Sequence, residues 1–199
     1  MSESYIILPT DGAGKKVRTV SKSISAQTVY SEFQVEDSKL NFQGAYLMCL
    51  RIAGSASAGY QYLSVYNPTA SGRVFKFKYV TISVDTGSVA NQIKVTRTTS
   101  LGTGTSQTAT KKHSSFSASV SNVRSALSGN ATLDKDVLGI AKPTTATFKL
   151  LDVDYTTTTL EDDQIVLREV EGLVIQQLSA GAVTEYLNIT VEWDEFTAT

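Results

Sequence analysis

The clearest pattern in this chain is the alternation of apolar and polar residues near its C-terminus. Within Glu185–Phe196 the apolar residues fall at every second position, from Leu187 to Trp193. Successive side chains of a β-strand point to opposite faces of the sheet, so this spacing predicts a strand with one buried and one solvated face. Two shorter strands joined by a tight turn are predicted just before it, at Gln164–Leu167 and Leu173–Leu178.

A second long strand is predicted over Arg73–Val84, but its apolar phase changes part-way. The large apolar residues from Phe75 to Tyr79 alternate in one phase, and those from Val80 to Val84 alternate in the opposite phase. A slip of one residue moves a side chain to the other face of a sheet. The sequence therefore predicts either a β-bulge near Tyr79 or a strand that passes from one sheet to another.

The remaining apolar segments are short and are separated by turn-forming Gly, Ser, Asn and Pro residues, and none has the 3.6-residue period of a helix. About nine or ten strands follow from this reading, which indicates an all-β fold, an antiparallel β-sandwich. Gly44–Ile52 is almost continuously apolar, which predicts a strand buried on both faces. The other expected strands are one or two within Val17–Val35, then Tyr60–Tyr66, Ile93–Thr98 and Thr145–Val153.

Two segments do not fit the alternating pattern. Residues 1–16 are dense in turn formers and are predicted to be an N-terminal extended arm, leaving 17–199 as a single sandwich domain. Residues 99–142 are rich in Ser, Thr and Gly, and predict a long irregular insertion with a short helical turn around Asn122–Leu127. We expect that both segments either contact neighbouring molecules or are disordered.

Composition limits the classes of function. With 199 residues, 41% of them hydrophobic, the chain can bury a real core, and its net charge of −1 argues against a nucleic-acid binder. Residues 1–100 hold 11 Lys and Arg against 6 Asp and Glu, whereas residues 101–199 hold 7 against 13. This asymmetry indicates either solvated faces of both signs or head-to-tail contact between copies. No apolar stretch approaches the roughly 20 residues that span a bilayer, so no membrane contact is expected.

The candidate residues for chemistry are few. Cys49 is the only cysteine and lies in an apolar run, so we expect a buried inert thiol, and the N-terminus has no secretory pattern, so we expect cytoplasmic synthesis. His113 is the only histidine and is expected in an exposed loop. Asp11–Lys16 resembles a phosphate-binding loop only faintly, because Pro9 replaces its first glycine.

No catalytic, cofactor-binding or metal-binding residue is predicted, and we expect that the protein is not an enzyme and takes no cofactor. An acidic group offers oxygen ligands for Ca²⁺, but its spacing matches no EF-hand loop and favours a solvated loop. Its members are Asp152, Asp154, Glu161, Asp162 and Asp163. Tyr60, Tyr62 and Tyr66 share one face of their predicted strand and form either a sugar-stacking platform or the cover of a second sheet or subunit interface.

Several segments, in their order along the chain, resemble structural proteins of tailed bacteriophages. The first segment has the form DG-x-GKK-V-T. The second contains an NP-x-x-SG turn, and the third contains the sequence RTT. The fourth has the form EGL-x-IQ, and the fifth has the form L-x-I-x-V-E-W-x-E. They are Asp11–Thr19, Leu63–Val74, Thr96–Thr99, Glu171–Gln176 and Leu187–Glu195.

The resemblance covers about a third of the chain and carries no catalytic residues. It implies a jelly-roll-like sandwich and a non-enzymatic virion protein, such as a capsid decoration or cement protein acting through protein–protein contacts. The implied partners are other virion proteins, the major capsid protein above all, and copies of the chain itself in a homotrimer. The implied location is the virion, after synthesis in the host cytoplasm. The alternative is a carbohydrate-binding or host-recognition module on a tail or fibre.

Overall fold

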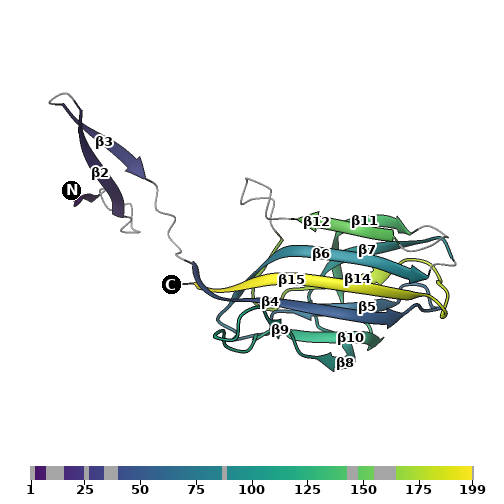
Figure 1. Cartoon of the computed structure of the whole chain (residues 1–199). Helices are drawn as coiled ribbons and strands as arrows, with labels where there is room; N and C mark the ends of the chain where they lie inside the picture. The colour runs from purple at the N-terminus through teal and green to yellow at the C-terminus, as the bar shows by residue number, and fades with distance from the viewer. Residues whose placement is uncertain are drawn as a thin grey trace. The chain divides into compact units, whose positions relative to one another are not determined.

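The computed structural model (Figure 1) is all-β in the residues that it describes, and none of these residues lies in a helix that could cross a membrane. The described residues are 3–7, 16–24, 27–33, 40–86, 89–142, 148–154 and 165–198. The chain divides into two compact units, Met1–Leu40 and Asn41–Ala198.

The N-terminal unit is a three-stranded antiparallel sheet in the order β1-β2-β3. Its strands are β1 (Glu3–Ile7), β2 (Lys16–Ile24) and β3 (Gln27–Phe33). The predicted boundary between residues 16 and 17 falls at the start of β2. The division of the chain differs from that boundary because β2 pairs with both β1 and β3. Of the predicted arm, the structure describes β1 and Lys16, and the rest lies outside the described residues.

The second unit contains two antiparallel sheets packed face to face (Figure 1), which confirms the predicted β-sandwich. The β15 sheet has the order β12-β6-β15-β4-β9, and β13 (Val166–Leu167) also pairs with β6. Its strands are β12 (Phe148–Asp154), β6 (Val74–Thr86), β15 (Tyr186–Ala198), β4 (Leu40–Ala53) and β9 (Thr110–Lys111). The β14 sheet has the order β11-β7-β14-β5-β10-β8. Its strands are β11 (Leu133–Lys142), β7 (Asn91–Thr98), β14 (Gly172–Gln177), β5 (Gln61–Tyr66), β10 (Asn122–Gly129) and β8 (Thr103–Gln107).

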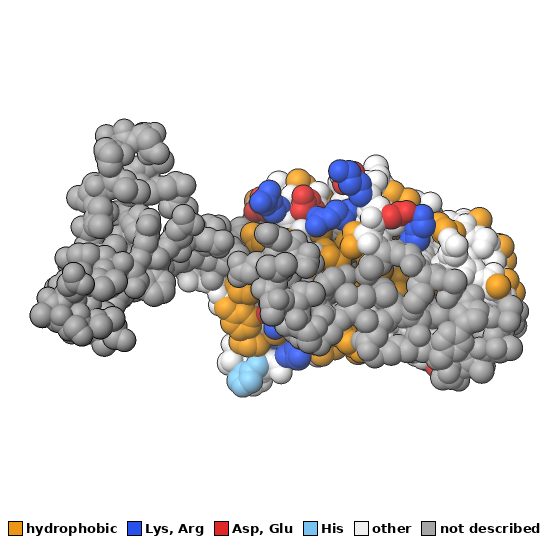
Figure 2. All heavy atoms as spheres, turned by 90° about the horizontal axis from the view of Figure 1, so that it is seen from above, with side chains coloured by type: hydrophobic (Ala, Val, Ile, Leu, Met, Phe, Trp, Pro, Cys, Tyr) orange, Lys and Arg blue, Asp and Glu red, His pale blue; other side chains and the backbone are white. Residues whose placement is uncertain are grey.

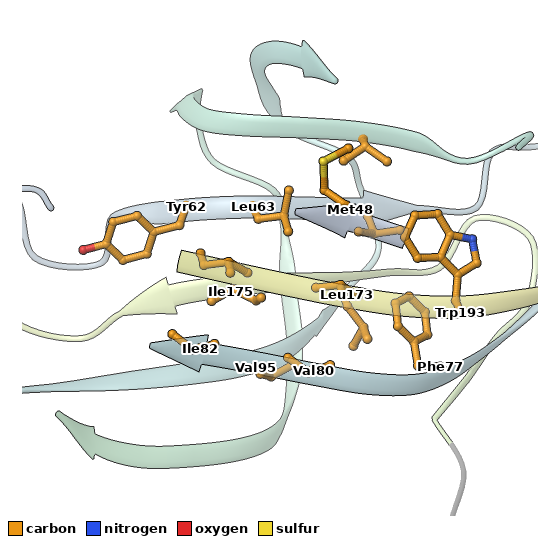
Figure 3. Packing of buried hydrophobic residues seen from close by; sticks show 14 of the residues in the cluster. Met48, Tyr62, Leu63, Phe77, Val80, Ile82, Val95, Leu173, Ile175 and Trp193 are labelled. Atoms are coloured by element: carbon orange, nitrogen blue, oxygen red, sulfur yellow. The ribbon is translucent and has the colours of Figure 1, made fainter. Parts of the chain in front are cut away.

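The core lies between the two sheets, and Trp193 of β15 is fully buried near one end of it, with Tyr62 near the other (Figure 3). The ring of Trp193 lies 6.2 Å from the ring of Tyr46 and 6.0 Å from that of Phe77, measured between centroids. Leu187, Ile189 and Val191 are buried on the same face, as their alternation predicted. Large aromatic rings bury on the order of 150–250 Å² each, so this cluster contributes much of the hydrophobic stabilisation.

The predicted phase slip in β6 is a β-bulge. Trp193 of β15 is opposite Phe77, but the preceding residue, Glu192, is opposite Tyr79, so Lys78 is the extra residue. Because the bulge restores the phase, Phe77 and Val80 are both buried in the core. Lys78 forms an ion pair of 2.6 Å with Asp194 on β15.

The prediction of an irregular chain over residues 99–142 is wrong, because β8, β9, β10 and β11 lie in it. The residues predicted as a helical turn, Asn122–Leu127, belong to β10. Their few apolar side chains do not bury enough area alone, but β10 pairs with β5, and β11 with β7, and these partners are central strands of the sandwich. Pairing with strands distant in the sequence therefore overrides the low local hydrophobicity.

β4 also differs from its prediction, because it is not buried on both faces. Tyr46 and Met48 point into the core, whereas Cys49 between Met48 and the next core position is exposed. The expectation of a buried thiol is therefore wrong. An apolar run shows that side chains tolerate burial, but it does not show whether a second layer covers both faces of the sheet.

The connections that enter β8 and leave β10 lie beside each other on the outer face of the β14 sheet. The backbone N–H of Thr99 donates to the carbonyl of Thr132 at 3.0 Å. The side-chain amide of Gln61 on β5 accepts from the N–H of Ala131 at 2.8 Å and donates to its carbonyl at 3.3 Å. Three apolar residues outside the main core cluster are buried in this part of the fold, namely Leu127, Ala131 and Val174.

Candidate interaction surfaces

His113 lies on the exposed connection between β9 and β10, as predicted, with Nδ1 2.7 Å from the hydroxyl of Ser115. Among the residues whose side chains the structure describes, no group of three or more His, Cys, Asp or Glu is placed to hold a metal ion. The side chains of the acidic group at residues 152–163 lie outside that set.

The three tyrosines of the predicted row do not share an exposed face. The β5–β14 register shifts by one residue at Tyr62, so Tyr62 points into the core and is fully buried. Tyr60 is half-buried with its ring 5.2 Å from that of Tyr62, and Tyr66 is half-buried at the far end of β5. The bulge at Tyr62 explains why the predicted row is not formed. It reverses which face of the sheet the side chains before it point to, relative to those after it.

A buried polar network closes the end of the sandwich near Tyr62. The hydroxyl of Tyr62 donates to the amide oxygen of Gln177, and the Gln177 amide nitrogen donates to the carbonyls of Ser55 at 2.7 Å and Ser57 at 2.6 Å. Burial raises the pKa of Tyr62 far above its usual value, and the nearby carboxylate of Glu185 raises it further. The network holds the β4–β5 connection against the end of β14.

A buried carboxylate closes the opposite end. Glu195 continues the inward-facing phase of β15 and is 1% exposed. It accepts hydrogen bonds from the hydroxyl of Ser119, from the backbone N–H of Val120 at 3.3 Å and from the indole N–H of Trp193 at 3.3 Å. Tyr46 donates to the carbonyl of Ser117 at 3.0 Å. Burial raises the pKa of Tyr46, and Glu195 adds to the effect. These contacts fix the β9–β10 connection over the core.

An aromatic patch at this connection consists of Phe42, which is exposed, and Phe116 and Phe196, which are half-buried. Phe42 is 49% exposed, and its ring centroid lies 5.5 Å from that of Phe116 and 5.6 Å from that of Phe196. The ammonium of Lys76 lies 5.5 Å from the ring centroid of Phe196. Figure 2 shows hydrophobic side chains beside the single histidine. Exposed aromatic residues of this kind are enriched where proteins contact one another.

The outer faces of both sheets carry paired charges. The Arg51 guanidinium donates to Asp85 at 2.8 Å and holds the pKa of that carboxyl below its usual value. On the β14 sheet, hydrogen bonds from Lys94 and then Thr96 lower the pKa of Asp136. These are solvated pairs, which contribute little to stability.

Comparison with known proteins adds no family. No protein-family model matches the chain, and neither the curated proteins nor the solved structures give a match.

Proposed function

We propose that this protein is a non-enzymatic structural subunit of a bacteriophage virion, a capsid decoration or cement protein that acts through protein–protein contacts. The observation that carries the proposal is the order of the strands in the two sheets. Jelly rolls, built from eight strands in two Greek keys, are a recurrent architecture of viral capsid domains.

The strand order supports a jelly-roll assignment. We take eight strands in chain order as β4, β5, β6, β7, β11, β12, β14 and β15. The first, eighth, third and sixth are neighbours in the β15 sheet, and the second, seventh, fourth and fifth are neighbours in the β14 sheet. Interleaving of eight strands in this way supports the proposed jelly roll. β8, β9 and β10 are then an insertion between the fourth and fifth strands, and they extend both sheets beyond β4 and β5.

The segments that resemble phage structural proteins supply much of this scaffold. Leu187–Glu195 lies in β15, and Glu171–Gln176 overlaps β14, and these are central strands of the two sheets. These two resembling segments therefore coincide with central strands of the sandwich. The aromatic patch of Phe42, Phe116 and Phe196 supports a role in contacts with neighbours, for which we propose the major capsid protein and further copies of the chain in a homotrimer. The proposed location is the virion, with no contact to nucleic acid or membrane.

The alternative, a carbohydrate-binding or host-recognition module, shares the fold, because lectin domains also use jelly rolls. Its main support in the sequence was the row of tyrosines. Since Tyr62 is fully buried and Tyr60 and Tyr66 are half-buried, three rings are not available for stacking on a sugar. The structural role is therefore the better supported of the two.

The test is to add the purified chain to empty capsids that lack it, measure co-sedimentation, and locate it on the shell by cryo-electron microscopy. A decoration protein binds in saturable amounts, and a glycan array gives no signal. Phe42→Asp is expected to weaken binding, whereas Val183→Asp serves as the matched control, because Val183 is 63% exposed in the β14–β15 connection. Glycan binding without capsid binding would overturn the proposal in favour of the alternative.

A further inference from the structure

β8 is the outermost strand of the β14 sheet, and one of its edges is open in the part of the chain that the structure describes. It pairs with β10 on one side, with Gln107 opposite Val123 and Thr105 opposite Ser125. The strand order places no described strand on its other side (Figure 1). The backbone N–H and C=O groups on that side are therefore a template for a further strand.

This edge lacks the usual protection against strand addition. Natural proteins place charged residues, above all Lys, or Pro on exposed edges, but Thr99–Thr110 contains neither a charged residue nor a proline. The strand at the opposite edge of the same sheet, β11, carries Asp134, Lys135 and Asp136, all exposed. The two edges of one sheet therefore differ, and only the β8 edge is suited to pairing.

β8 is also held firmly in place. A Cβ on Gly104 would lie 2.6 Å from the carbonyl oxygen of Ser125, so only glycine permits the close approach of β8 to β10. Gly102 has a φ of 74°, which favours glycine, and it starts the turn into the strand. The side-chain amide of Gln107 donates to the hydroxyl of Ser125 at 2.8 Å. A strand already fixed in extended form loses little conformational entropy when a partner adds to it.

We propose that β8 pairs antiparallel with β8 of a second copy of this chain, across a two-fold axis at Thr105. In this register Thr103 is opposite Gln107, Gly104 is opposite Ser106, and Thr105 is opposite itself. The two β14 sheets then form one continuous sheet through the pair. A two-fold contact uses the same surface on both copies, so each hydrogen bond is made twice.

A second copy suits this edge better than an unrelated strand because of its charge and composition. Self-pairing of a strand brings its own charges close together, and like charges on opposed strands are destabilising. β8 has no charge, so the cost is absent, and the pair of Thr105 side chains at the two-fold axis is of a kind that is favourable on opposed strands. The exposed side chain of Thr105 lies at the centre of the proposed pair. The inference does not depend on the virion role, and the two-fold contact is distinct from the contacts of the proposed homotrimer, so it would join two monomers or two trimers.

The experiment is analytical ultracentrifugation of the full chain over a range of concentrations, with charge variants at the centre of the pair. Wild-type protein is expected to double in mass as concentration rises, and Thr105→Lys and Thr105→Glu alone are expected not to. An equimolar mixture of the two variants should restore the doubling, because opposite charges then face each other. Thr69→Lys, the same substitution on an exposed turn residue, should behave as wild type.

A wild-type protein whose mass never doubles, or one whose doubling survives Thr105→Lys, would overturn the proposal. So would a mixture of the two charge variants that fails to associate. Circular dichroism verifies that each variant is folded. Hydrogen exchange of the wild type provides a test without any variant: amides of residues 103–107 should exchange more slowly at high concentration, whereas those of 133–137 should not change. Equal exchange at both concentrations would also overturn the proposal.

Discussion

Two polar side chains that point inward, Gln177 and Glu195, determine how the ends of the sandwich core are closed. Each lies at the end of an apolar alternation, on β14 and β15 respectively, and each is almost fully buried. Buried polar groups are tolerated when they are hydrogen-bonded, and both of these bind the backbone of a connecting loop. The same residues that end the core therefore also position the loops that cover it.

The first prediction concerns the hydroxyl group that Tyr62 donates to Gln177. Tyr62→Phe keeps the ring in the core but removes the donor, so the free energy of unfolding should fall by about 1–2 kcal/mol, the usual cost of a lost buried hydrogen bond. Denaturant titration at pH 7 measures this. Tyr60→Phe is the matched control, because Tyr60 is only half-buried, and its effect should be smaller.

The raised pKa of Tyr62 adds a pH dependence with a definite sign. Tyrosine in an unfolded chain has a pKa of about 10, so below that pH the phenol is neutral in both the folded and the unfolded state. The stability advantage of wild type over Tyr62→Phe, measured as the difference in free energy of unfolding, is then complete. Above that pH the unfolded chain loses the proton while the folded protein keeps it, so the advantage shrinks as pH rises. An advantage that grows above pH 10 would contradict the burial of this hydroxyl.

At the scale of single residues, the period-2 pattern predicted burial well where only one face of a strand meets the core. Trp193 and Ile189 are examples on β15. Glu195 lies in the same phase, which was the available signal for its inward direction, but a carboxylate is ordinarily assigned to solvent. Cys49 shows the opposite error, since an apolar neighbourhood does not reveal that the outer face of β4 is exposed there.

At the scale of elements, two of the register shifts in the sandwich, at Lys78 and at Tyr62, have similar effects, and the sequence predicted one of them. The bulge at Lys78 was visible because large apolar residues on both sides of it change phase. The bulge at Tyr62 was not, because β5 is buried on both faces and Gln61 and Ser64 are as buried as the apolar residues. Register can be read from a sequence only where one face of the strand is polar.

Deletion of Lys78 tests the role of the bulge in β6. Without the extra residue, Phe75, Phe77 and Val80 fall in one period-2 phase and stay in register with β15, so all three should remain in the core. Exposure of two such side chains, which would cost at least about 3 kcal/mol, is therefore not expected, and the loss should be limited to the ion pair with Asp194. Chemical denaturation measures the loss.

The control for the deletion is Lys78→Ala, which keeps the bulge and removes only the ion pair with Asp194. Asp194 has a side-chain exposure of 8%, so a moderate loss is expected, similar to that of the deletion. A loss of about 3 kcal/mol or more in the deletion alone would contradict this account, because it would show that the core residues need the bulge to keep their phase.

At the scale of the whole molecule, the strand order brings the basic first half of the chain against the acidic second half. Three ion pairs among the described side chains join the two halves: Lys78 with Asp194, Lys94 with Asp136, and Arg97 with Glu171. Some basic residues of the first half therefore have acidic partners in the second half of the same molecule. The charge pattern along the chain does not reveal these partners, because sheet order is set by the pairing of distant strands.

The last prediction follows from the division of the chain at residue 40. Among the described residues, every member of the core cluster lies between Tyr46 and Trp193, so the sandwich should fold without residues 1–39. Its melting temperature should stay within about 4 °C of the full chain, the shift that roughly 1 kcal/mol produces in a domain of this size. A peptide of residues 1–40 has no cysteine for a disulfide and is near the size below which chains rarely fold alone, so it should be unfolded by circular dichroism. If instead the truncated sandwich melts much earlier or without cooperativity, the first 40 residues are part of its core and the division is wrong.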